Sequence, residues 1–364
     1  MKKPLLGILV FLVVIGLAAV VLSGAFSGET SPLQLVEPFP LPKALSLCGE
    51  PMPLGDPDAR EMLDRELHNI ACDRARVLLV IKRAGRYFPY VEKRLAELGM
   101  PDDLKYLCVA ESSLLPYAKS PQGALGPWQF IQGTGVRMGL RYDSTYDERL
   151  DFERATEAAL SYLRGLREMF GSWAAAMAAY NCGENRIRTE IYEQRVTDYY
   201  RLDLSQETER YIFRIATFKL IMENPAQYGY RIPKEQMYSS FPCDAVPVDI
   251  RSPLHIADVA QALGTDYKMI KELNPQIIGR FLPLGQYALK TPTGTGSKLK
   301  KFLESAPPPA EVSKEEPKST YTVKQGDTLA EVSRRTGVPV ETLKRLNSIQ
   351  GSHLSPGQKL RIVP

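Results

Sequence analysis

The chain has 364 residues, of which 44% are hydrophobic and 24% are charged, so a proper hydrophobic core is possible and two or three domains are expected. The net charge is only +4 and no block of basic residues stands out. A nucleic-acid-binding protein is therefore not indicated.

The N-terminus predicts export. Two lysines in Met1–Pro4 precede an uncharged apolar run from Leu5 to Phe26. About 20 apolar residues suffice to span a bilayer, and the run exceeds the roughly 7–15 residues of a typical signal-peptide core. We expect residues 1–26 to be a membrane anchor, with a cleaved signal peptide as the alternative because Ser23–Ala25 are small. The remainder would lie in the cell envelope, on the periplasmic side.

The next segment is rich in proline and is followed by a long helical region. Six prolines between Pro32 and Pro53 predict an extended linker over 27–59. Apolar residues recur with helical period from about residue 60, and no strand pattern appears before 225. We expect a mainly α domain over 60–242, with its core at 85–225. Helices are expected after Pro101, a good first-turn residue, and at 152–170, 173–180, 185–194 and 208–222.

The C-terminal part contains an internal repeat. The segments that begin at Ile256 and Leu329 align at a shift of 73 residues. Each predicts a short strand, two short helices and a second strand, a small α+β unit of βααβ order. We place these units at 243–292 and 321–364. The segment 293–320 between them is rich in Pro, Lys and Glu and predicts a flexible tether.

Cysteine and histidine do not indicate a metal site. No two cysteines have the CxxC spacing of a metal site, and the three histidines are scattered. Outside the cytoplasm the cysteines could form disulfides, or they could be buried free thiols, and the sequence does not give a pairing. The five are Cys48, Cys72, Cys108, Cys182 and Cys243.

One carboxylate stands where a core residue is expected. Glu111 continues the apolar face formed by Leu104, Leu107 and Cys108. Burial disfavours the charged form and should raise the pKa of this glutamate. A protonated carboxyl group at neutral pH is what a general acid requires. A capping carboxylate or a buried ion pair is the alternative.

A loop punctuated by Gly and Pro follows, from Ser120 to Gln129. Its small residues would allow a glycan to approach the backbone closely. Gln129 could hydrogen-bond an acetamido group, and Trp128 could stack on the face of a sugar.

Two later stretches place polar residues at helix ends. Ala-Tyr-Asn-x-Gly ends one helix with Tyr180 and Asn181 before a glycine turn. Glu-Thr-x-x-Tyr starts another helix with Thr208 as the expected cap and carries Tyr211.

Four motifs in this order resemble the lytic transglycosylases with a goose-lysozyme-like SLT domain. They are Glu111-Ser112, Gly-Ala-x-Gly-x-x-Gln, Ala-Tyr-Asn-x-Gly and Glu-Thr-x-x-Tyr. The resemblance implies that Glu111 is the catalytic acid/base and that Tyr211 faces it. It also implies substrate-binding positions, with Ser120 at the muramic acetamido group; they are Ser120, Gln129, Tyr180 and Asn181. Trp128 departs from the family, which usually has Met there.

The C-terminal repeat resembles the LysM domain, a carbohydrate-binding module. Residues 321–364 match nearly end to end, including Gly326-Asp327-Thr328 and Leu346-Asn347. The unit at 243–292 has Ser252–His255 in place of the Gly-Asp-Thr turn and is similar to a degenerate LysM module. The resemblance implies binding to N-acetylglucosamine-containing glycans, with a spacer role as the alternative for both units.

The mechanism depends on how many carboxylates are available. Most glycosidases use two, yet Glu184 and Asp143 do not fall in an apolar pattern and are interpreted as surface residues. The resemblance implies substrate-assisted cleavage of peptidoglycan between N-acetylmuramic acid and N-acetylglucosamine, with 1,6-anhydromuramic ends and without a metal or cofactor. A hydrolytic muramidase on the same fold and a non-catalytic peptidoglycan-binding protein are the alternatives. Mid-strand and end cleavage both stay open.

Overall fold

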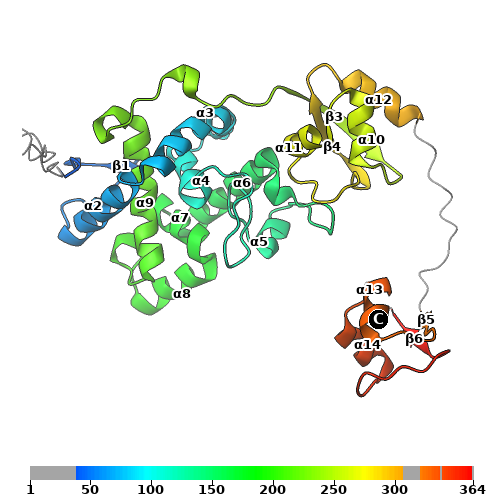
Figure 1. The fold of residues 1–364 in the computed structure, drawn as a ribbon. Helices are drawn as coiled ribbons and strands as arrows, with labels where there is room; N and C mark the ends of the chain where they lie inside the picture. Colours follow the sequence, from blue (N-terminus) through cyan, green and yellow to red (C-terminus); the bar gives the residue numbers. More distant parts are fainter. Residues whose placement is uncertain (1–37, 306–319, 337, 363–364) are drawn as a thin grey trace, which may run out of the picture. The chain divides into compact units, whose positions relative to one another are not determined.

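The computed structural model describes residues 38–305, 320–336 and 338–362 (Figure 1). The chain divides into two compact units. One runs to Ser240 without Ser144–Tyr146, and the other contains Ser144–Tyr146 and the residues from Phe241 onward. The predicted anchor over 1–26 lies outside the described residues. Within the described ranges, no helix combines the length and apolar character needed to cross a membrane.

The first unit is mainly helical, as predicted. Side chains of Asp56, Asp73, Asp151 and Ser172 accept hydrogen bonds from the backbone at four helix N-termini, which explains where these helices begin. The α-helices are α2(Pro57–Ala71), α3(Arg74–Glu97), α4(Lys105–Ser112), α5(Gln132–Arg137), α6(Phe152–Phe170), α7(Trp173–Cys182), α8(Glu184–Gln194) and α9(Gln206–Glu223). Short 3-10 helices lie at Asp102–Leu104, Glu148–Leu150, Tyr199–Arg201, Pro225–Tyr228 and Lys234–Gln236.

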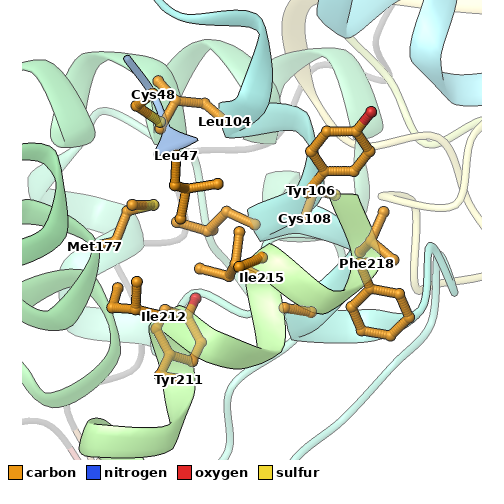
Figure 2. Packing of buried hydrophobic residues seen from close by; sticks show 14 of the residues in the cluster. Leu47, Cys48, Leu104, Tyr106, Cys108, Met177, Tyr211, Ile212, Ile215 and Phe218 are labelled. Atoms are coloured by element: carbon orange, nitrogen blue, oxygen red, sulfur yellow. The ribbon is translucent and has the colours of Figure 1, made fainter. Parts of the chain in front are cut away.

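Helix α9 organises the core of this unit, because α2, α4 and α7 all pack against it. Figure 2 shows side chains of α4 and α9 meeting, among them Cys108, Ile215 and Phe218. Helix α7 contains five buried alanines, whose small side chains permit close helix packing. This packing brings the C-terminal ends of α4 and α7 near the N-terminal turn of α9.

The expected linker over 27–59 is wrong for its described part. Four residues of the stretch 47–54 belong to the helical core: Leu47, Cys48, Met52 and Leu54. Leu47 is only 2% exposed, and Figure 2 shows it beside Cys48 in this core. The strands β1(Ser46–Leu47) and β2(Glu50–Pro51) form a small antiparallel pair. Its turn is fixed because the Cys48 backbone amide donates to Asp103 Oδ2 at 2.7 Å. Apolar residues between the prolines supply burial that a free linker would lack.

The cysteines of the first unit are not cross-linked. Cys48, Cys72, Cys108 and Cys182 are free, so the disulfide alternative does not apply to them. Cys48 and Cys108 are buried in the core (Figure 2).

The second unit contains the first βααβ module, as the repeat predicts. The strands β3(Cys243–Ile250) and β4(Gly285–Pro292) pair antiparallel along their whole length. Helices α10(Ile256–Leu263) and α11(Tyr267–Leu273) lie between them in sequence. Helix α12(Gly296–Ser305) follows, and its Leu299 is buried in the hydrophobic cluster that these strands and helices form. The expected tether over 293–320 is therefore wrong for 296–305, and 306–319 lie outside the described residues.

The second module has the same order. Strands β5(Thr320–Thr322) and β6(Lys359–Arg361) pair antiparallel, with α13(Leu329–Thr336) and α14(Val340–Asn347) between them in sequence. Asn347 closes the module, because its side chain donates to the Arg361 carbonyl and accepts from the Arg361 amide. Asn274 makes the same two bonds with Lys290 in the first module. The multi-domain prediction, helical domain plus βααβ modules, is confirmed.

Candidate active site

A pocket of about 420 Å³ opens on the helical unit. Its lining comes from the end of α4, the loop before α5, the junction of α7 with α8, and the start of α9. Most of the predicted site residues line it; these are Glu111, Ser120, Gln129, Tyr180 and Asn181. Residues far apart in sequence are thus brought to one cavity.

Glu111 occupies the last turn of α4. The helix stops because Ser113 and Leu114 both adopt left-handed conformations, with φ of 53° and 57°. Arg76 Nε donates to Ser113 Oγ at 2.9 Å, and Arg83 donates to the Ser113 carbonyl. Ser112 donates to the Cys108 carbonyl and supports the helix end. These bonds fix the turn that carries Glu111 into the pocket wall.

Tyr211 faces Glu111, and its hydroxyl donates to Glu111 Oε1. Burial raises the pKa of Glu111 to about 7, whereas the Tyr211 hydrogen bond and the positive charge of Arg214 act in the opposite direction. The predicted rise in this pKa is confirmed. Tyr211 itself is buried behind the carboxylate and is not part of the pocket lining.

Trp128 does not stack on a ligand, and that prediction is wrong. Its indole is 0% exposed and donates from Nε1 to Thr156 Oγ1 at 2.8 Å. A large aromatic ring with a satisfied N–H gains more from burial than from exposure in a loop. Its backbone carbonyl still serves the site, because it accepts the Tyr180 hydroxyl at 2.7 Å.

The Gln129 side chain is held with its amide nitrogen toward the backbone of its own loop. Its backbone has a φ of 49°, and Nε2 donates to the carbonyls of Ala118 and Gly126 at 2.9 and 2.7 Å. The amide oxygen is therefore the group that can accept a hydrogen bond from a ligand. Gly126 cannot be replaced here, since a Cβ would lie 1.9 Å from the Arg149 carbonyl oxygen.

Ser120 closes the same loop. Its backbone amide donates to the Ala124 carbonyl, and its Oγ accepts from the Ala124 amide at 3.1 Å. The hydroxyl proton remains available to donate toward the pocket that Ser120 lines.

Asn181 links the end of α7 to the start of α9. Its Oδ1 accepts from Thr208 Oγ1 at 3.1 Å. Thr208 is not the helix cap, which corrects the expectation. Helix α9 begins at Gln206 after Ser205, and the Ser205 hydroxyl bonds that of Thr208 at 3.0 Å.

Glu184 was missed as a pocket residue. It lines the cavity, with 15% of its side chain exposed, so its interpretation as a surface residue is wrong. Arg137 pairs with it, and Tyr162 donates to it at 2.6 Å. The Arg137 hydrogen bond is the main cause that lowers the pKa of Glu184 to about 2. The sequence signal that could have placed Glu184 in the pocket is its position directly after Gly183, the last residue of the Ala-Tyr-Asn-x-Gly motif. Asp143 pairs with Arg141 and is 38% exposed.

Both the helical unit and the C-terminal module are similar to known protein families. The transglycosylase SLT domain model matches residues 91–202, and the LysM domain model matches 321–363. The membrane-bound lytic murein transglycosylase D of Escherichia coli strain K12 is 32% identical over 332 residues, which are 87% of this chain and 72% of the relative. The chain belongs to the lytic murein transglycosylases. The resemblance to this family and to LysM is therefore confirmed.

Two further relatives match shorter stretches of this transglycosylase. The peptidoglycan transglycosylase gp16 of Escherichia phage T7 is 42% identical over 88 residues, 24% of this chain and 7% of the relative. The solved 70 kDa soluble lytic transglycosylase of Escherichia coli is 20% identical, with a TM-score of 0.32, over 43% of this chain and 27% of that chain.

Proposed function

We propose that the chain cleaves the β-1,4 bond between N-acetylmuramic acid and N-acetylglucosamine in peptidoglycan and leaves 1,6-anhydromuramic ends. The family supports a peptidoglycan-cleaving lyase as the class of enzyme. The observation that carries the mechanism is Glu111, a carboxylate with a pKa raised to about 7 on the wall of a 420 Å³ pocket.

Glu111 acts first as the general acid. Tyr211 donates to Oε1, so the carboxyl proton belongs on Oε2. Glu111 transfers this proton to the glycosidic oxygen as the bond to C1 breaks. The carbonyl oxygen of the muramic N-acetyl group bonds to C1 and stabilises the positive charge that develops there, as in substrate-assisted glycosidases.

Glu111 then acts as the base. It takes the proton of the muramic 6-hydroxyl, O6 attacks C1, and the acetamido oxygen is released. The proton count on Glu111 is restored and no water is consumed. Attack within one sugar residue is favoured entropically over attack by a separate molecule.

The remaining lining residues bind the glycan in this proposal. The Ser120 hydroxyl, the Gln129 amide oxygen and the Asn181 amide are polar groups at the pocket surface, suited to the acetamido and hydroxyl groups of the sugars. Tyr180 contributes its ring, because its hydroxyl is committed to the Trp128 carbonyl. Trp128 supports this wall from behind.

The other parts of the chain concentrate the enzyme on its substrate. The 321–364 module binds N-acetylglucosamine residues of the peptidoglycan chains. The degenerate 243–292 module is a second, weaker contact or a spacer. Two linked contacts raise the effective concentration of each at the polymer. Residues 1–26, as an anchor or a cleaved signal peptide, deliver the helical domain of 60–242 to the periplasmic side of the cell envelope.

Mass spectrometry of the products from purified peptidoglycan tests the reaction. Muropeptides one water lighter than hydrolysed species, without reducing ends, are expected. Reducing ends would instead make the chain a hydrolytic muramidase, with Glu207 and Glu184 as the pocket carboxylates to examine for activating water. Binding without cleavage would indicate a peptidoglycan-binding protein.

A further inference from the structure

An ion-pair cluster around a buried glutamate joins α2 to α9. Glu66 of α2 is 2% exposed, and its carboxylate pairs with Arg210 Nε at 2.5 Å and Arg214 Nε at 3.6 Å. Residues four apart on a helix lie on one face, so Arg210 and Arg214 meet Glu66 together. Such a buried carboxylate is stable only because cations compensate its charge.

Arg214 also belongs to the helix face that carries the site. Glu207, Tyr211 and Arg214 follow at spacings of four and three, and Tyr211 bonds Glu111 directly. The guanidinium of Arg214 therefore lies where the Glu66 face and the Tyr211 face of α9 overlap.

We propose that Glu66 is a positioning residue for the reaction, which holds the Arg214 guanidinium in an ion pair and so keeps its charge from pairing with Glu111. The inference rests on the proposed acid/base role of Glu111. Without Glu66, Arg214 would lose the buried anion with which it pairs. An unpaired guanidinium beside a partly buried carboxylate stabilises its ionised form, which cannot donate a proton.

The other charged and titratable groups around Glu111 do not replace Glu66. Arg76 and Arg83 add positive charge at the end of α4 through Ser113. Glu207 is exposed at the start of α9, and Glu184 is already paired with Arg137. The remaining neighbours are neutral hydroxyl and thiol groups, from α4, α7 and α9; they are Cys108, Tyr180 and Tyr211.

The test compares pH profiles of kcat/KM on purified peptidoglycan fragments. The basic limb is the part of the profile in which kcat/KM falls as the pH rises and Glu111 loses its proton. Glu66→Gln should move this limb to lower pH, by about half a unit or more, because Arg214 then favours ionised Glu111. Activity should be close to wild type well below that limb. Arg214→Gln should move the limb to higher pH, and the double variant should return toward wild type.

Glu157→Gln is the matched control. Glu157 of α6 pairs with Arg94 of α3, so its loss also breaks an interhelical ion pair. We expect the control to reduce stability without moving the basic limb. A uniform loss of activity at all pH values in Glu66→Gln, with an unmoved limb, would show a merely structural role and overturn the inference.

Titration of the Glu111 carboxyl by ¹³C NMR separates this inference from the proposed function. The Glu111→Gln variant identifies the resonance. If Glu66→Gln leaves the Glu111 midpoint unchanged, the inference is wrong whatever the activity. If Glu111→Gln retains lytic activity, the proposed function fails, even where the titration still shows the coupling. Should Glu66→Gln not fold, Glu66→Asp takes its place, because the shorter side chain keeps the anion but draws it away from Arg214: a downward shift of the Glu111 midpoint supports the inference, and no shift overturns it.

Discussion

Two carboxylates in one pocket have opposite environments. Glu111 lies in the last turn of α4, where the helix dipole disfavours negative charge, and burial raises its pKa to about 7. Glu184 begins α8, where the dipole favours negative charge, and Arg137 helps to lower its pKa to about 2. Environments that separate two pKa values in this way assign one group to proton transfer and the other to a fixed charge.

Glu111→Gln should have the largest effect. It removes the exchangeable proton while keeping a group that can accept the Tyr211 hydrogen bond. Lytic activity should fall by about 10²–10⁴-fold, the usual contribution of a general acid or base. Release of soluble muropeptides measures it. An unchanged rate would remove Glu111 from the mechanism.

The free energy of unfolding should depend on pH through the ionisation of Glu111. The folded pKa of Glu111, about 7, exceeds its ordinary value of 4.5, so the folded state binds the proton more tightly. Its contribution is therefore full below pH 4.5 and lost as the pH rises through 7. The unfolding free energy of wild type relative to Glu111→Gln should fall by about 3 kcal/mol from pH 4 to pH 8. Denaturant titrations at both pH values measure this difference, and a constant difference would contradict the raised pKa.

Glu184→Gln should cost much less activity, less than about tenfold, because the ion pair shapes the wall without exchanging a proton. The comparison uses the same muropeptide assay and the same chemical change as at Glu111. A loss as large as that of Glu111→Gln would break the contrast and favour a mechanism with two carboxylates.

Tyr211→Phe should have the smallest effect and sharpen the contrast. The hydroxyl stabilises the Glu111 carboxylate, so its removal raises the pKa of Glu111 further. The basic limb of the kcat/KM profile should move to higher pH, with a few-fold loss at pH 6 from a less fixed carboxyl group. A limb that moves to lower pH would show that the hydroxyl acts in another way.

The sequence predicts well where local signals agree. Helix α6 has the expected bounds, because Asp151 caps its start and Gly171 adopts the left-handed conformation at its end. Glu111 was recognisable since a single carboxylate interrupts an apolar face. The repeat register was also visible, and Asn274 and Asn347, aligned by the 73-residue shift, make equivalent bonds.

Prediction fails where a distant partner decides the environment. Trp128 is buried because Thr156, 28 residues away, accepts its N–H. Glu184 belongs to a helix with only Ile187 buried, and its pocket position depends on Arg137, 47 residues earlier. The proline-rich stretch that ends in Leu54 packs on a core formed by later residues. None of these partners is adjacent in the sequence, so composition and periodicity could not identify them.

The burial of Trp128 has an optical consequence. The chain has two tryptophans, and the other, Trp173, is part-exposed at the start of α7. In a Trp173→Phe protein the emission would come from one indole, directly behind the wall where Tyr180 lies. The enzyme thereby carries its own fluorophore behind the pocket wall, and we expect its emission to change when the pocket is filled.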